Sequence, residues 1–221
     1  ILRGHTGSVL CLQLENDWLV SGSSDGTMRI WDIKTAKLIQ VINRHNGPVL
    51  SLKFYGDFMV TGCKDKTIYL WDRSKLDNVQ LISEIREHVS PVNVVEIDDR
   101  VFISGGADRV IHIWDLKTKQ LKRSLIGHQR GIAAMHMQGN LLVSGSNDET
   151  VRVWDIKNGI CLRALKGHES LVRSVYIGDN YIVTGSYNGL LIAWDKRVIL
   201  FFLVIFLRNY LIRKVLMTIT N

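Results

Sequence analysis

Cysteine is scarce in this chain, which holds three cysteines in 221 residues. Cys11, Cys63 and Cys161 are odd in number and show no spacing that is typical of a metal site. We therefore expect neither a disulfide framework nor a metal, and we predict no cofactor. Core or turn thiols of a protein in a reducing compartment are the simplest interpretation.

Long hydrophobic runs are also missing. The apolar run at 198–207 has ten residues, whereas a membrane-spanning helix needs about 20. Arg208, Arg213 and Lys214 interrupt any longer count. No secretory signal is visible. We therefore expect no membrane span and a cytoplasmic or nuclear protein.

Compact catalytic patterns are absent too, since the sequence contains no GxSxG, HExxH, P-loop or CxxC pattern. We expect no enzyme. The formal net charge is +7, but residues 196–221 hold five Lys or Arg and no acid, so +2 remains for residues 1–195. General basicity is therefore no argument for a nucleic-acid partner, and none is expected.

The sequence does contain a unit of about 40 residues that occurs five times. In each unit a His stands 26 residues before a Trp-Asp pair, and an Asp or Asn lies 20 residues after the His. The recurring residues are His5, Ser21, Asp25 and Trp31; His45, Thr61, Asp65 and Trp71; His88, Ser104, Asp108 and Trp114; His128, Ser144, Asp148 and Trp154; and His168, Thr184, Asn188 and Trp194. This periodicity decides the fold.

Each unit is predicted to form four short antiparallel strands. In the fourth unit, short apolar runs at 131–137, 141–144, 151–154 and 160–165 are separated by turn residues. One such sheet cannot bury both faces alone, whereas sheets stacked around an axis can. We predict an all-β fold, a β-propeller over residues 1–197. Its repeats lie near 5–32, 45–72, 88–115, 128–155 and 168–195.

The ends and one connection depart from this regularity. At about 40 residues per blade the chain is short of seven blades, so we expect a fragment of a seven-bladed propeller, with Ile1–Arg3 as the end of an outer strand. Three extra residues within 73–79 should lengthen a surface loop and leave the core alone. Residues 198–221 form a hydrophobic and basic tail that we interpret as non-native, although 201–205 could supply the last blade's fourth strand.

The recurring His, hydroxyl, carboxylate and indole groups are predicted to form one closed chain of hydrogen bonds in each blade. Such a buried network stiffens a blade when it is complete. Five histidines distributed around a ring cannot converge on one metal ion or substrate. We therefore predict a structural role for them.

Two further positions per unit should point to one rim of the propeller. The residue before the turn Asp or Asn varies between units, unlike the core positions: Ser24, Lys64, Ala107, Asn147 and Tyr187. The residues that follow each His add Ser8, Leu50, Asn93, Arg130, Gly131, Ala133, Leu171 and Arg173. Guanidinium, ammonium and hydroxyl groups together suit a phosphorylated, partly apolar peptide. A merely solvated surface is the alternative.

The repeated GH and WD pairs resemble those of WD-repeat (WD40) propellers. The stretches GHTGSVLCLQL, PVNVVEIDDR and RGIAAMHM are similar to the propeller of F-box/WD-repeat proteins of the β-transducin-repeat-containing type. This resemblance implies a substrate receptor of an SCF ubiquitin ligase that binds a doubly phosphorylated DSGxxS-type degron. It places phosphate and backbone contacts on Ser8, Ser24, Lys64, Asn93, Arg130, Gly131, Arg173 and Tyr187, with Leu50 and Leu171 lining an apolar part. Asn147 stands where that family has Ser, and Ala107 where it has Gly.

The partners implied by this resemblance are phosphorylated substrate proteins. Skp1 and a cullin would join only through an F-box that lies before residue 1. The alternative is a non-degradative WD-repeat scaffold in a signalling or RNA-processing complex.

Overall fold

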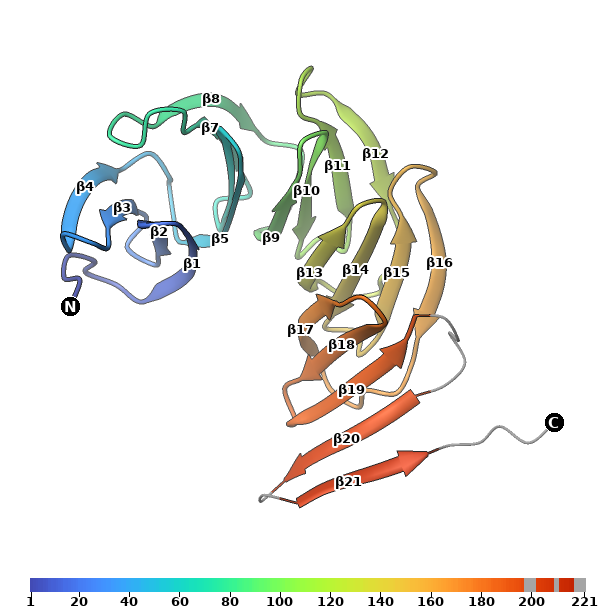
Figure 1. The fold of residues 1–221 in the computed structure, drawn as a ribbon. Coiled ribbons are helices and arrows are strands. Elements are labelled where there is room, and N and C mark those ends of the chain that lie inside the picture. The colour runs from blue at the N-terminus through green and yellow to red at the C-terminus, as the bar shows by residue number, and fades with distance from the viewer. Residues whose placement is uncertain (197–201, 209–210, 217–221) are drawn as a thin grey trace. The chain divides into compact units, whose positions relative to one another are not determined.

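The computed structural model describes residues 1–196, 202–208 and 211–216, the last two ranges as backbone. Every element in these ranges is a β-strand, and the strands form five antiparallel sheets (Figure 1). Within each sheet, strands that are consecutive in the sequence are neighbours. This confirms the predicted all-β propeller fold with five repeats. The chain divides into two compact units, residues 1–124 and 125–221, and each is described by itself.

Unit 1 contains three blades of four strands. Blade A comprises β1 (Val9–Glu15), β2 (Trp18–Ser23), β3 (Met28–Asp32) and β4 (Lys37–Ile42). Blade B comprises β5 (Val49–Tyr55), β6 (Phe58–Cys63), β7 (Ile68–Asp72) and β8 (Gln80–Ile85). Blade C comprises β9 (Val92–Ile97), β10 (Val101–Gly106), β11 (Ile111–Asp115) and β12 (Leu121–Leu125), which reaches the unit boundary. The expectation that Ile1–Arg3 end an outer strand is wrong, because these residues lie in no strand.

Unit 2 contains two blades. Blade D comprises β13 (Ile132–Gln138), β14 (Leu141–Ser146), β15 (Val151–Asp155) and β16 (Ile160–Leu165). Blade E comprises β17 (Val172–Ile177), β18 (Tyr181–Ser186), β19 (Leu190–Asp195), β20 (Phe202–Arg208) and β21 (Leu211–Leu216). The fourth strand, β20, lies close to the predicted 201–205 and pairs with β19. The parts of the predicted tail at 198–201, 209–210 and 217–221, and residue 197 before it, lie outside the described residues.

The hydrophobic core lies between consecutive blades. In blade B, Val49, Leu52 and Phe54 of the inner strand β5 are at most 5% exposed. Leu52 and Phe54 belong to one hydrophobic cluster with residues of blade A such as Val20 and Ile30. In blade C the equivalent residues Val92, Val95 and Ile97 are buried in the same way against blade B, whereas those of blade A, Val9, Leu12 and Leu14, are exposed. Burying an aliphatic side chain in this way stabilises the fold by about 1.5–3 kcal/mol.

The three extra residues lie where they were predicted, in the loop 73–79 between β7 and β8. The expectation that this loop leaves the core alone is wrong. Val79 is buried against blade A and exchanges two hydrogen bonds with the Gln40 side chain. Arg73 is buried over the Phe54 ring and donates to Glu15 at 2.8 Å. The loop ends therefore link the two blades.

Candidate functional site

The predicted hydrogen-bond chain closes in blade D. His128 Nε2 lies 2.7 Å from Ser144 Oγ, which also accepts the Trp154 indole N–H at 2.8 Å. His128 Nδ1 lies 2.9 Å from Asp148 Oδ2. Asp148 further accepts the backbone N–H of Gln129 at 2.7 Å. The carboxylate therefore fastens the loop before β13 to the turn between β14 and β15.

The same chain closes in blades A and C. His5 joins Ser21 and Asp25, with Trp31 donating to Ser21. In blade C the corresponding contacts link the four residues His88, Ser104, Asp108 and Trp114. Three blades thus carry the complete network.

Blades B and E depart from the prediction of one closed chain per blade. In blade B the Tyr69 hydroxyl donates to Asp65 Oδ2 at 2.9 Å, and His45 Nδ1 is buried without a partner although His45 Nε2 still meets Thr61 Oγ1. The Trp71 indole N–H also donates to Thr61 Oγ1. The network is open in blade B because the Tyr69 hydroxyl, and not His45 Nδ1, is bonded to the Asp65 carboxylate.

In blade E the open end has another cause. His168 Nε2 and the Trp194 indole both meet Thr184 Oγ1, but His168 Nδ1 is buried without a partner. The Asn188 side-chain oxygen instead contacts the Ser186 hydroxyl and the Leu190 N–H. The turn residue of blade E is thus an amide, Asn188, in place of the carboxylate that pairs with the histidine in blades A, C and D.

The titration of these groups follows from the contacts. Burial alone would raise the pKa of Asp148, but the hydrogen bonds from Thr150, Gln129 and His128 together lower it to about 2. Burial lowers the pKa of His45 and of His168 to about 4. Among the residues that the structure describes, no group of His, Cys, Asp or Glu could hold a metal ion. Burial also raises the pKa of the Cys11 thiol to about 12.

The two predicted rim positions lie side by side in every blade. In blade D the Asn147 N–H donates to the Gly131 carbonyl at 3.0 Å, and in blade E the Tyr187 N–H donates to the Leu171 carbonyl. The equivalent pairs in unit 1 are Ser24 with Ser8, Lys64 with Pro48, and Ala107 with Pro91. The residue before the turn is therefore held at the start of the inner strand.

A β-bulge lies at the start of every inner strand and leaves one residue out of register. These bulged residues are the ones five positions after each His: Leu10, Leu50, Asn93, Ala133 and Arg173. A bulge turns a side chain away from the regular alternation of a strand. Sequence reasoning named four of these positions but had no signal for the bulge itself.

In unit 1 the candidate rim residues share one end of the blades. Gln13 exchanges two hydrogen bonds with the Phe54 backbone, and the Val95 N–H donates to Ser51 Oγ. The inner strands therefore run side by side in the same direction, and their starts meet. This end carries Ser8, Ser24, Leu50, Lys64 and Asn93, of which Ser8, Ser24 and Lys64 are exposed.

The same holds in unit 2. Arg173 donates to the Ala133 carbonyl, and the Ile177 N–H donates to His136 Nδ1. The strands β13 and β17 therefore also start at one end. This end carries Arg130, Gly131, Asn147, Leu171, Arg173 and Tyr187, with Tyr187 79% exposed. That the residues of the two units form one patch stays a prediction.

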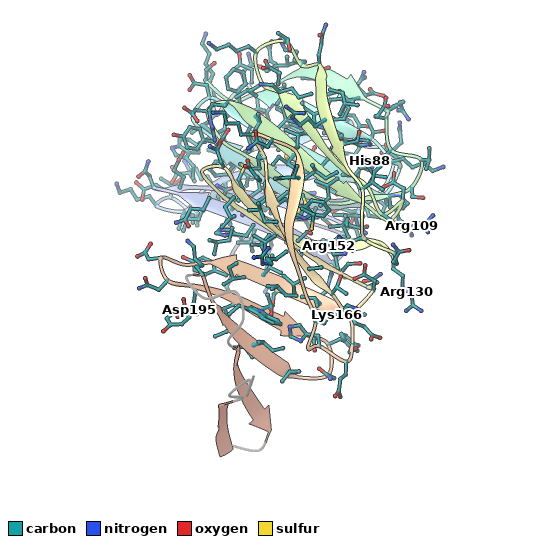
Figure 2. All side chains as sticks on the ribbon, turned by 90° about the vertical axis from the view of Figure 1, so that its right-hand side faces the viewer. His88, Arg109, Arg130, Arg152, Lys166 and Asp195 are labelled. Carbon is teal, nitrogen blue, oxygen red and sulfur yellow. The ribbon has the colours of Figure 1, made fainter. Side chains whose placement is uncertain are left out.

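A polar cavity of about 550 Å³ opens at this end of unit 2. Arg130, Arg152 and Lys166 line it (Figure 2) together with Gln129, Asp148, Glu149, Thr150 and His168. Sequence reasoning missed Arg152 and Lys166. One signal was available: Gly127 precedes its His and leaves room for the Arg152 guanidinium, which a Cβ would meet at 2.7 Å.

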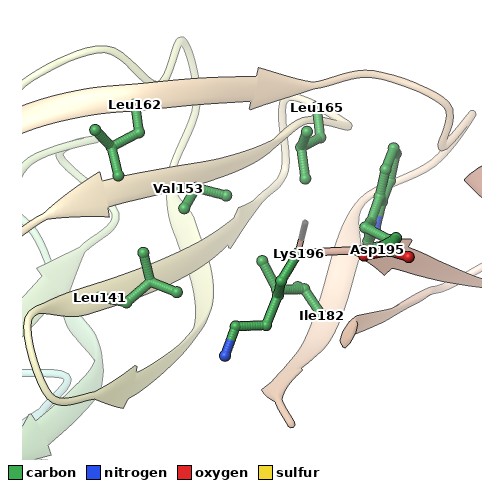
Figure 3. A pocket seen from close by; sticks show the side chains of 8 residues that line it. Leu141, Val153, Leu162, Leu165, Ile182, Asp195 and Lys196 are labelled. Carbon is green, nitrogen blue, oxygen red and sulfur yellow. The ribbon is translucent and has the colours of Figure 1, made fainter. Parts of the chain in front are cut away.

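A second cavity, of about 240 Å³, lies between blades D and E and is apolar (Figure 3). Leu141, Val153, Leu162 and Ile182 are among its walls. The ammonium group of Lys196 is already bound to Gln138 Oε1 and the Gly178 carbonyl. Apart from Asp195 and Lys196, the described residues that line this cavity are apolar or aromatic, so it offers few polar groups that would orient a ligand.

No helix in the described ranges is long and apolar enough to cross a membrane. Curated relatives match stretches of about 40 residues of the chain. SCF subunit sconB of Arthroderma benhamiae, a probable E3 ubiquitin ligase complex subunit, is 50% identical over 42 residues, which is 19% of this chain and 6% of that protein. The BOP1 homolog of Oryza sativa, named a ribosome biogenesis protein, is 46% identical over 43 residues, again 19% and 6%. Ribosome biogenesis protein YTM1 of Coccidioides immitis is 56% identical over 39 residues, 16% of this chain and 8% of that protein.

These matches span less than a tenth of each relative, whereas a family profile covers nearly the whole of the repeat region. The profile described as the TEP-1 second beta-propeller matches residues 8–202. This range holds four complete His-to-Trp repeats and most of the first. The chain is a WD-repeat β-propeller and belongs to the TEP-1 second beta-propeller family.

Proposed function

We propose that this protein-interaction propeller is the phosphopeptide-binding part of a substrate receptor of an SCF-type ubiquitin ligase. Binding rather than catalysis is the activity proposed. The observation that carries the proposal is the end of unit 2, where Arg130, Arg173 and Tyr187 are exposed beside a bulged inner strand. The similarity to sconB, whose name places it in such a complex, supports it.

Phosphate chemistry suits these side chains. A phosphoserine carries a charge of roughly −1.5 to −2 and three acceptor oxygens, and an arginine offers a planar fork of donors to it. Leu171, half-buried next to Tyr187, provides an apolar contact for a neighbouring residue of the peptide. In unit 1, the exposed Lys64 and Ser24 carry an ammonium group and a hydroxyl at the equivalent end of the blades. A DSGxxS-type degron phosphorylated on both serines is the proposed ligand.

The experiment measures the affinity of the chain for a fluorescent DSGxxS-type peptide phosphorylated on both serines. Arg173→Ala should weaken binding about tenfold or more, since it removes a charge-assisted contact. Arg163→Ala is the matched control, because Arg163 is exposed on the outer strand β16. Equal affinity for phosphorylated and unphosphorylated peptide, or an unchanged affinity of Arg173→Ala, would refute the proposal.

A second candidate is a scaffold without a degradative role. The similarity to BOP1 and YTM1, which are named ribosome biogenesis proteins, favours it. Affinity purification of the full-length protein separates the two. Co-purification of Skp1 and a cullin supports the receptor, whereas co-purification of preribosomal proteins without Skp1 supports the scaffold.

A further inference from the structure

Three cations from separate segments meet at the polar cavity of unit 2. Arg130 comes from the loop before β13, Arg152 from β15, and Lys166 from the connection between β16 and β17 (Figure 2). Blade D supplies the first two, and the third stands two residues before His168 at the start of blade E. The cavity thus lies on the same end as the rim, on the side of the outer strands.

The counter-charges in this cavity are few. Asp148 is occupied, because it accepts hydrogen bonds from His128, Gln129 and Thr150. His168 is neutral at pH 7, since burial holds its pKa near 4. Glu149 is the one exposed carboxylate among the lining residues. Within the described part of the chain, neither Arg130 nor Lys166 forms an ion pair.

Arg152 is held in place by its neighbours. Its guanidinium lies 5.8 Å from the Trp154 ring centroid, and one Nη donates to Cys161 Sγ at 3.5 Å. Its Nε is buried and has no hydrogen-bond partner. A fixed guanidinium loses little conformational freedom when it binds an anion.

Blade A shows which part of this arrangement is particular to blade D. Arg29 occupies the position of Arg152 and also has a buried Nε without a partner. The positions of Arg130 and Lys166, however, are Gly7 and Asn43 in blade A. An unpartnered Nε is therefore shared by Arg29 and Arg152, whereas blade A lacks the group of three cations that lines the cavity of blade D.

We propose that this cavity binds a further phosphoserine or phosphothreonine of the peptide held on the rim, outside the DSGxxS segment. The proposal rests on the proposed function, because the rim must hold the peptide first. The phosphate oxygens would accept from Arg130, Arg152 and Lys166, and Glu149 would oppose them. Peptides with one more phosphorylated residue on the correct side should therefore bind more tightly.

The test compares the doubly phosphorylated DSGxxS-type peptide with a series that carries one further phosphoserine at increasing distances on either side. At one distance the third phosphate should tighten binding about tenfold at low salt, since two or three charge-assisted hydrogen bonds form. Lys166→Ala should abolish most of this gain, and Glu149→Gln should enlarge it. Lys157→Ala is the matched control, because this exposed lysine lies in the turn between β15 and β16 at the other end of blade D.

The outcomes separate the two proposals. A doubly phosphorylated peptide that binds, with no gain from a third phosphate at any distance, overturns the cavity proposal and leaves the proposed function intact. No binding of any phosphopeptide overturns both. The NMR signal of Arg152 Nε–H gives a direct readout: it should shift with the triply phosphorylated peptide. An equal shift with the same concentration of inorganic phosphate would mean an adventitious ion only and would overturn the proposal.

Discussion

Blades D and E have the same strand order and the same spacing from His to Trp, yet they differ at the turn between their second and third strands. In blade D, Asp148 closes the network on His128, whereas in blade E, Asn188 leaves His168 Nδ1 buried without a partner. The His, the hydroxyl and the Trp are joined in both. Between these two blades, closure therefore follows the turn residue, a carboxylate in blade D and an amide in blade E. Blade B shows that a carboxylate alone is not enough, because the Tyr69 hydroxyl occupies Asp65 there.

The largest effect that separates the two blades should come from removing the turn side chain. Asp148→Ala leaves His128 Nδ1 and two backbone N–H groups without an acceptor, so we expect a loss of about 2–4 kcal/mol in the free energy of unfolding. Asn188→Ala removes an acceptor that the histidine does not use, and should cost less than about 1 kcal/mol. Urea unfolding measures both. Equal losses would contradict the assigned role of the carboxylate.

The second-largest effect should come from acid, which is expected to lower the stability of the blades whose networks are open. The pKa of His168 is about 4 in the folded chain and about 6.5 when unfolded. Between these values the unfolded chain binds a proton that the folded chain does not, so stability present above pH 6.5 is lost as the pH falls toward 4, by up to about 1 kcal/mol per pH unit. His168→Gln should flatten this dependence. His45, with the same open Nδ1, should behave alike.

Glu96 provides an opposite reference for this pH dependence. Burial raises its pKa to about 7, against the opposing effect of Lys53 at 3.6 Å. The contribution of Glu96 to the free energy of unfolding is therefore fully present below about pH 4.5 and is lost as the pH rises through 7. Glu96→Gln removes this opposing contribution, so the net loss of stability between pH 7 and pH 4.5 should become larger. A histidine variant whose unfolding curve retains the full acid dependence would refute the role of the open networks.

The strands and the network residues could be predicted because each is tied to a spacing that repeats five times. The opening in blade E was visible only as an Asn at position 188. The opening in blade B was not visible at all, since Asp65 is present there and the competing Tyr69 hydroxyl reaches it from within β7. Side-chain competition of this kind depends on the direction of a ring, which a pattern of residue types does not contain.

The candidate site was predictable to a similar degree. The loop that follows each His and the turn that carries each Asp or Asn lie at the same end of a four-stranded meander. Their residues were therefore expected at one rim, and in each unit they lie at one end of the blades. The cavity cations were missed because Arg152 and Lys166 are 14 residues apart and Lys166 belongs to the next blade's entry. Such a meeting follows from blade stacking, not from the repeat itself.

The smallest expected effect is also the sharpest test of the comparison. Asn188→Asp should give blade E the acceptor that blade D has, and bring a carboxylate to His168 Nδ1. We expect stability at pH 7 to rise by about 0.5–1.5 kcal/mol, the net value of one buried hydrogen bond. The pKa of His168 should rise at the same time, because an adjacent anion favours the imidazolium form.

Two measurements decide this prediction, urea unfolding at pH 7 and an NMR titration of the His168 ring. Asn180→Asp is the matched control, since it makes the same chemical change at an exposed turn at the other end of blade E. If Asn188→Asp gains stability and raises the pKa of His168, and Asn180→Asp does neither, the amide of Asn188 accounts for the difference between the networks of blades D and E. If the pKa of His168 does not move, the backbone of the turn in blade E, and not the amide, keeps the network open.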